Sequence, residues 1–267
     1  MKIITTILFL LFPLISSAQA SGGQIVRHKP RTTGTAKFAP SSNVSRRNKI
    51  IQNLIDNMTF VEGGWFTMGT TKEQIEKGDS IEIPVREIRV SSFYIGRFEV
   101  TQEEWQAVMG NNPSDFEGPP RPVENVSWND CQTFIKKLNS ITHHITHKEF
   151  RLPTEIEWEY IARGGRKARG LKYSGSNYLV DVGWYKLNSD METHSVGSKS
   201  PNELGIYDMS GNVWEWCDSW SYSNQPIIRG GGWNDAIKNC RVSCRLSMDS
   251  DSKSNEVGFR LAYDTFK

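Results

Sequence analysis

Two carboxylates that flank a tight turn are the first residues able to do chemistry. Asp208 and Glu215 bracket residues 209–212, where glycine and asparagine tolerate positive φ angles. Such a turn can aim main-chain carbonyls inward, and carboxylates together with carbonyls form the hard-oxygen cage that suits Ca²⁺. The alternative is a turn that leads into a core strand with a satisfied glutamate. The residues alone leave both interpretations open.

Four cysteines are the second candidates: Cys131, Cys217, Cys240 and Cys244. All four follow an N-terminal segment typical of exported proteins, and an even number of cysteines in an oxidising compartment favours disulfides. Three pairings are possible. The sequence therefore predicts disulfides without fixing their connectivity.

A histidine run offers a weaker metal hypothesis. His143 and His147 are four residues apart with His144 between them, so two imidazoles could share one helix face and bind a transition metal. The run ends a predicted helix beside Lys148, and no third ligand is in view. We therefore favour a surface loop here.

The N-terminus has the features of an export signal. Lys2 precedes the apolar residues 3–15, and small residues at 18 and 20 suit cleavage, so residues 1–20 are predicted to be a signal peptide. This apolar run is too short to span a bilayer and no second one follows, which predicts no membrane span. The mature protein is expected to be periplasmic or secreted.

Charge divides the chain unevenly. Residues 1–49 hold eight Lys or Arg and no Asp or Glu, which leaves 24 bases against 30 acids and a net charge of −6 for residues 50–267. Residues 21–44 are basic and poor in apolar side chains, so we predict a flexible arm. Because a solvated linker explains its charge, we predict no nucleic-acid partner.

Capping patterns and apolar spacing position these candidates. A short helix is expected over residues 45–58, and capping boxes at Thr101, Ser127 and Thr154 open three more helices. Strands are expected over 60–68, where glycines suggest a hairpin or bulge, and over 89–100. Short strands and long loops follow residue 166. The prediction is an α+β fold with few short helices and short antiparallel strands, forming one domain over residues 59–267.

Five ordered motifs resemble one known family. GNVWEW at 211–216 is similar to a signature of the formylglycine-generating enzymes, also called sulfatase-modifying factors. The other motifs are FVEGGWFTMG (60–69), FEVTQEEW (98–105), RLPTEIEWEYIARGG (151–165) and RGGGW…CR…GFRLA (229–262). They cover residues 57–264. The resemblance implies an irregular, loop-rich fold related to C-type lectin domains.

The resemblance also implies site residues. The family's calcium site maps onto Asp208, Gly211, Val213 and Glu215, with Gly211 and Val213 acting through their carbonyls. A disulfide between Cys217 and Cys240 is implied by the family's cysteines at corresponding motifs. Cys131 and Cys244 would then form the remaining pair.

The family's catalytic copper site fits less well. Formylglycine-generating enzymes oxidise a substrate cysteine with O₂ on Cu(I) held by two cysteines separated by four residues. Alignment on Arg241 places Val242 and Ile237 at the two ligand positions, while Cys240 and Cys244 are separated by only three residues. These two cysteines are weak catalytic candidates, and Cu(I) is not expected.

Two functions remain after this comparison of motifs. The first is an exported O₂-dependent oxidoreductase that acts on a peptide or precursor. The second is a non-catalytic, lectin-like binding or structural module of an envelope or secretion assembly, with the polar segment 247–255 suited to recognition. Both predict a peptide or protein partner, and neither predicts an oligomeric state.

Overall fold

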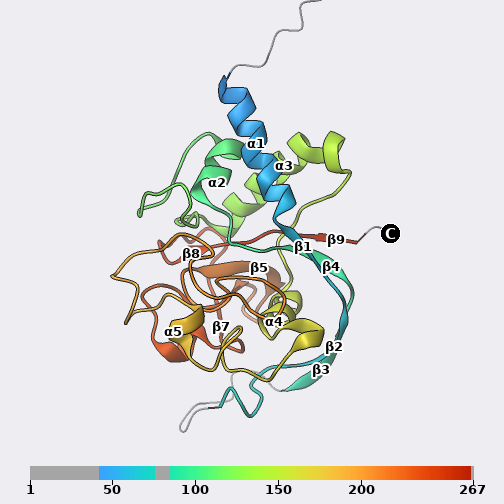
Figure 1. The fold of residues 1–267 in the computed structure, drawn as a ribbon, viewed down its shortest axis with the longest axis vertical. Helices are drawn as coiled ribbons and strands as arrows, with labels where there is room; N and C mark the ends of the chain where they lie inside the picture. Colours follow the sequence, from blue (N-terminus) through green and yellow to red (C-terminus); the bar gives the residue numbers. More distant parts are fainter. Residues whose placement is uncertain (1–41, 76–84, 266–267) are drawn as a thin grey trace, which may run out of the picture. The chain divides into compact units, whose positions relative to one another are not determined.

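Three helices gather at one end of the part of the chain that the structure describes (Figure 1). The structure is a computed structural model and describes residues 42–75 and 85–265. The helices are α1 (Ser42–Asp56), α2 (Gln102–Met109) and α3 (Trp128–Thr146). Leu54, Trp105 and Phe134 bring their apolar faces into one core cluster. The predicted helix at 45–58 is therefore present, but it begins and ends earlier in the chain.

Local capping explains where the helices begin. Thr101, Ser127 and Thr154 each accept a hydrogen bond from the third residue of the helix that follows, and that residue's carboxylate bonds back to the cap. The three predicted capping boxes are confirmed. Thr154 opens α4 (Glu155–Ala162). Gly110 ends α2 with φ 90°, a conformation that glycine adopts without strain.

In residues 42–75 and 85–265, nine short strands form three small sheets. The first has the order β1 (Met58–Val61), β4 (Phe93–Gly96), β9 (Ala262–Asp264), and the second pairs β2 (Gly64–Met68) with β3 (Arg86–Val90). The third has the order β7 (Arg245–Ser247), β6 (Pro226–Arg229), β5 (Trp214–Trp220), β8 (Val257–Gly258). Only β5 and β8 run parallel. Strand β5 lies in the middle of this third sheet and brings Trp214 and Trp216 into the core.

The hairpin expected within residues 60–68 is wrong. Gly63 separates β1 from β2, and these strands join different sheets. A Cβ on Gly63 would stand 2.3 Å from the Val90 carbonyl oxygen, so the close approach of two backbones explains the glycine.

Small helices complete the described chain. They are α5 (Leu179–Val182) and the 3₁₀ turns η1 (Gly165–Lys167) and η2 (Ile237–Cys240). Short strands, few helices and long connections confirm the predicted α+β, loop-rich class. In the two described ranges, no helix has the length and apolarity needed to cross a membrane. The predicted signal peptide and residues 21–41 of the predicted arm lie outside the described residues.

Candidate functional site

The acid-flanked turn has the tight backbone that its sequence predicts. Asp208, Gly211 and Asn212 all have positive φ angles, of 57°, 95° and 67°. A Cβ at Gly211 would stand 2.2 Å from the Trp184 carbonyl oxygen, so only glycine fits. The turn is thus packed against a neighbouring loop and leads directly into β5.

Glu215 is fully buried and engaged by other side chains. Its Oε2 accepts hydrogen bonds from Arg260 Nε at 2.6 Å and from Trp158 Nε1 at 2.8 Å. Its Oε1 accepts another from Arg260 Nη2 at 2.7 Å. Arg260 is therefore paired with a buried acid, and the pair joins β5 to the segment that precedes β9.

Asp208 lies beside this pair with one oxygen left over. Its Oδ2 accepts a hydrogen bond from the Gly197 amide at 2.6 Å, whereas Oδ1 is buried without a partner. A third carboxylate, Glu99, completes an acidic cluster that sequence reasoning missed. It accepts a hydrogen bond from Asn212 Nδ2 at 2.6 Å and one from the Val213 amide at 3.3 Å.

Burial makes this acidic cluster electrostatically unbalanced. Burial, and then the charges of Asp208 and Glu215, raise the pKa of Glu99 well above its ordinary value. Burial likewise raises the pKa of Asp208 to about 6. Arg260 is the one base among these four buried groups. A cation would offset the excess negative charge.

Calcium fits this donor set in part. The unpartnered Asp208 Oδ1 offers a hard oxygen, whereas both oxygens of Glu215 already accept hydrogen bonds from Arg260 and Trp158. No three acidic, histidine or cysteine side chains converge with metal-binding geometry in residues 42–75 and 85–265. A calcium ion would therefore also need the carbonyls of Gly211 and Val213, as the family resemblance implies.

The four cysteines are all buried thiols, distributed over three core clusters. Cys217 lies in one cluster, Cys240 in another, and Cys131 and Cys244 share the third. Neither predicted disulfide is formed among these described residues. Burial raises the pKa of the Cys131, Cys217 and Cys240 thiols well above the ordinary value, which disfavours the thiolate that binds metals.

The two aligned copper positions carry no sulfur. Val242 is fully buried in the core cluster that includes Cys217, and Ile237 is a partly exposed residue of η2. Cys240 is covered by the glycine-rich segment after β6, since a Cβ on Gly231 would lie 2.7 Å from its sulfur. The backbone of this segment thus packs closely against η2.

The histidine run lies on the surface at the end of α3. His143, His144 and His147 are exposed, and the ring centroids of His143 and His147 are 6.2 Å apart. The run is helical up to Thr146, with His147 as a left-handed cap. The predicted surface position is confirmed, although most of the run is helix and not loop.

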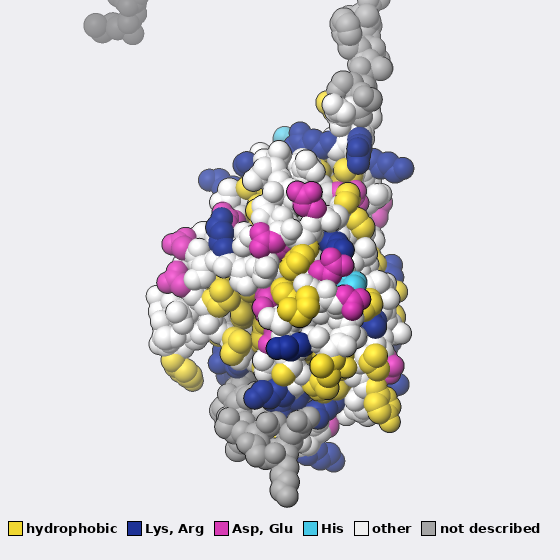
Figure 2. Space-filling model, turned by 90° about the vertical axis from the view of Figure 1, so that its left-hand side faces the viewer, with side chains coloured by type: hydrophobic (Ala, Val, Ile, Leu, Met, Phe, Trp, Pro, Cys, Tyr) yellow, Lys and Arg dark blue, Asp and Glu magenta, His cyan; other side chains and the backbone are white. Residues whose placement is uncertain are grey.

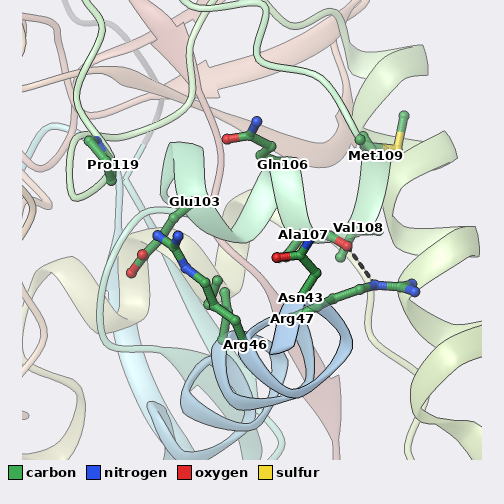
Figure 3. Close-up of a pocket in the computed structure, with 11 residues that line it drawn as sticks. Asn43, Arg46, Arg47, Glu103, Gln106, Ala107, Val108, Met109 and Pro119 are labelled. Carbon is green, nitrogen blue, oxygen red and sulfur yellow. Dashed lines mark hydrogen bonds between the residues drawn. The ribbon is translucent and has the colours of Figure 1, made fainter. Parts of the chain in front are cut away.

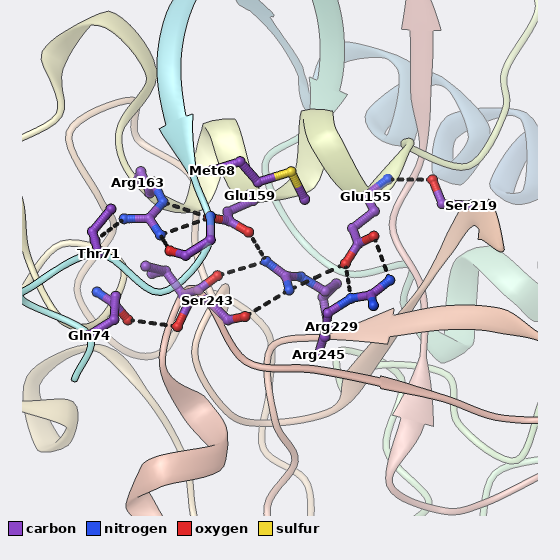
Figure 4. Close-up of polar contacts among 12 residues, drawn as sticks. Met68, Thr71, Gln74, Glu155, Glu159, Arg163, Ser219, Arg229, Ser243 and Arg245 are labelled. Atoms are coloured by element: carbon purple, nitrogen blue, oxygen red, sulfur yellow. Dashed lines mark hydrogen bonds and ion pairs between the residues drawn. The ribbon is translucent and has the colours of Figure 1, made fainter. Parts of the chain in front are cut away.

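A second buried charged cluster also escaped sequence reasoning. Arg229 Nη2 lies 2.5 Å from Glu159, and its Nη1 lies 3.4 Å from Glu155. Glu155 also pairs with Arg245, and Glu159 also pairs with Arg163, so that bases and acids alternate across the cluster (Figure 4). Both acids come from α4, four residues apart. That i, i+4 spacing was a signal that the sequence did contain.

Comparison with known proteins agrees with this architecture. The sulfatase-modifying factor enzyme 1-like domain matches residues 44–265. A chaperone protein, LppX, of Paenibacillus barcinonensis is 34% identical over 77% of this chain and 89% of its own length. A formylglycine-generating enzyme of Streptomyces coelicolor is 33% identical over 57% of this chain and 55% of its own. An inactive C-alpha-formylglycine-generating enzyme 2 of Bos taurus is 28% identical over 77% of this chain and 87% of its own length.

Solved structures give the same result. Treponema denticola variable protein 1 superposes with a TM-score of 0.68 and 31% identity over 78% of this chain and 95% of that one. PvdO of Pseudomonas aeruginosa superposes with a TM-score of 0.64 and 25% sequence identity, over 78% of this chain and 94% of that one. The family domain, at residues 44–265, begins within α1 and includes β9 and the acid-flanked turn. The chain therefore belongs to the sulfatase-modifying factor enzyme 1-like family.

Proposed function

We propose that this protein is an exported, non-catalytic member of the family that binds a peptide or protein partner. The proposal rests on the residues that occupy the two positions aligned with the family's copper ligands. Val242 is a core residue and Ile237 has no donor atom, while the nearby Cys240 is a buried thiol of raised pKa. A cuprous ion needs two thiolates within reach, and these residues do not supply them.

An apolar surface around α5 supports partner binding. Tyr178 and Leu187 are 73% and 77% exposed, and Val180 and Ile237 add further exposed apolar area. The Lys186 amide donates to the Asp235 carbonyl at 3.1 Å, which holds the loop after α5 against the approach to η2. We call Tyr178, Val180, Leu187 and Ile237 the α5 surface.

Helix α5 lies on the left-hand side of Figure 1, the side that Figure 2 shows, and hydrophobic side chains gather between charged ones on that face. Exposed apolar patches rimmed by polar groups mark protein interaction sites. One relative is named a chaperone and another an inactive enzyme, which accords with binding in place of catalysis.

Calcium would have a structural role in this proposal. Asp208 and Glu215, with the carbonyls of Gly211 and Val213, would hold the ion, which requires Glu215 to exchange a hydrogen bond from Arg260 or Trp158 for the metal. Its charge would balance the buried carboxylates and fix the turn that leads into β5. Export rests on the predicted signal peptide at residues 1–20.

Copper loading tests whether the protein lacks a functional copper site. The mature protein is incubated with Cu(I) under reducing conditions, and O₂ uptake is followed with a Cys-x-Pro-x-Arg peptide. We expect neither stoichiometric copper nor peptide-dependent O₂ uptake. Turnover that disappears in Cys244→Ser would overturn the proposal and favour the oxidoreductase.

Aggregation of reduced insulin tests apolar binding. The wild-type protein is expected to suppress light scattering, and Leu187→Asp should weaken suppression because it places a charge in the α5 surface. Leu246→Asp is the matched control, since Leu246 is 50% exposed on β7. Equal suppression by both variants would show that the α5 surface is not the binding site.

A further inference from the structure

The helical end of the molecule exposes cations that no acidic side chain neutralises. We define the basic helical end as the exposed faces of α1 and α3, which carry Arg46, Arg47, Lys49, Lys136 and Lys137. Asp56 is the one acid of α1 and Asp130 the one acid of α3. Both lie at helix ends, so the exposed faces between them are uniformly basic.

Helix α3 separates its two faces cleanly. The buried residues are Cys131, Phe134, Ile135, Leu138 and Thr142. Lys136, Lys137 and Ser140 are exposed, and the same face continues to His143 and His144. The helical repeat therefore places the lysines and histidines on the solvent side.

Many arginines elsewhere in the domain are paired with acidic side chains. Examples are Arg166 with Glu62, Arg169 with Glu203 and Arg163 with Glu73. In contrast, none of the five cations of the basic helical end is in an ion pair within residues 42–75 and 85–265. Their charge remains available to a partner.

A groove separates α1 from α2 at this end. It has a volume of about 580 Å³ (Figure 3). Arg47 Nε donates to the Ala107 carbonyl at 2.8 Å across the groove, which fixes α1 on the end of α2. Arg46 and Glu103 both line the groove without forming an ion pair. The packing that orders α1 thus uses few of its cationic groups.

Apolar side chains stand among these cations. Val44 on α1 is 45% exposed and Ile145 on α3 is 64% exposed. A soluble polyanion would gain nothing from them, whereas a bilayer surface accepts both cations and apolar side chains. Residues 21–41, directly before α1, add four Lys or Arg and no acid. From this combination we infer that the basic helical end docks on a bilayer of anionic phospholipids.

Vesicle sedimentation tests the inference on the mature protein. We expect binding to vesicles of phosphatidylglycerol mixed equally with phosphatidylcholine, little binding to phosphatidylcholine alone, and release by salt. Lys136→Gln with Lys137→Gln should weaken the partition coefficient about thirtyfold, because each basic residue at an anionic surface contributes about fivefold. The basic arm is identical in both proteins, so it does not contribute to the difference.

A charge-matched control tests whether vesicle binding depends on the basic helical end or only on net charge. Lys167→Gln with Lys186→Gln removes the same charge from exposed sites outside α1 and α3 and should leave partition nearly unchanged. Equal weakening by the two double variants would overturn the inference, as would equal binding to neutral vesicles. Retention on heparin beads without vesicle binding would also overturn it and point to a soluble polyanion.

Discussion

The two buried charged clusters share a tryptophan but differ in their charge balance. Trp158 packs its ring under the Arg229 guanidinium, 5.3 Å from the ring centroid, and donates its Nε1 hydrogen to Glu215. On the Arg229 side, acids and bases alternate. On the Glu215 side, three carboxylates face Arg260, and an oxygen of Asp208 has no partner.

This difference separates a structural role from a binding role. A buried ion network with matched charges holds elements together, here α4 against β6, and needs nothing from outside the chain. A cluster with excess carboxylates has a raised free energy until a proton or a cation joins it. The comparison therefore predicts that the two clusters respond differently to mutation, pH and metal.

The largest expected effect is at Arg229. Arg229→Met removes the central base and leaves Glu155 with Arg245 and Glu159 with Arg163 as their remaining partners. We expect a loss of about 3 kcal/mol or more in the free energy of unfolding, because a buried charge loses its compensation. Urea denaturation measures this loss. Arg245→Met, at the half-exposed end of the alternation, is the control and should cost much less.

Glu124 is a buried acid outside both clusters, and it makes the free energy of unfolding depend on pH. Burial raises the pKa of Glu124 to about 7, with the Asp115 charge adding to the shift and the amides of Phe116 and Asp115 opposing it. The folded state thus holds this proton more tightly than the unfolded state, where the pKa is near 4.5. The free energy of unfolding should fall by up to about 3 kcal/mol as pH rises between these values.

Glu124→Gln is expected to flatten this dependence, because the amide keeps the hydrogen bond from Phe116 but does not titrate. Thermal melts of both proteins across the same pH range provide the measurement. Parallel pH profiles would show that Glu124 is not the group responsible.

Calcium should act on the unbalanced cluster alone. At a concentration one hundred times its dissociation constant, an ion that binds only the folded state stabilises it by about 2.7 kcal/mol. Calorimetry with calcium and with a chelator should show this as a shift in Tm. Asp208→Asn should abolish the shift, and Glu124→Gln should retain it. An unchanged Tm in the wild-type protein would exclude calcium at the turn.

The smallest effect is expected at the outer end of the balanced cluster. Glu73 lies 3.3 Å from Arg163, and its side chain is 23% exposed. Solvent screens this pair, so Glu73→Gln should cost less than about 1 kcal/mol in urea denaturation. A loss comparable to that of Arg229→Met would mean that the alternating charges act as one unit.

Short-range patterns made much of the fold predictable. A capping box needs only four consecutive residues, and all three occur where the sequence places them. The glycine and asparagine of the turn likewise indicated positive φ angles, which Gly211 and Asn212 adopt. Helix starts, the main loops and the turn at Asp208 were therefore accessible from sequence.

The partners of the buried charges were not predictable in this way. Glu99 meets Asn212 across 113 residues, and Trp158 meets Glu215 across 57. No local pattern distinguishes such a carboxylate from an exposed one, because its environment exists only after distant elements pack. The same reason explains the hairpin expected at Gly63, where the chain changes sheets instead of folding back.

The first sheet has a consequence for biosynthesis. Among the described strands, its edge strand β9 is the last along the chain and its other edge strand β1 is the first, with β4 between them. Until residues 262–264 have left the ribosome, β4 lacks a neighbour and Arg260 has not reached Glu215. A truncated protein that ends before Arg260 and lacks β9 would therefore leave both β4 and the buried Glu215 without partners that come from far along the chain.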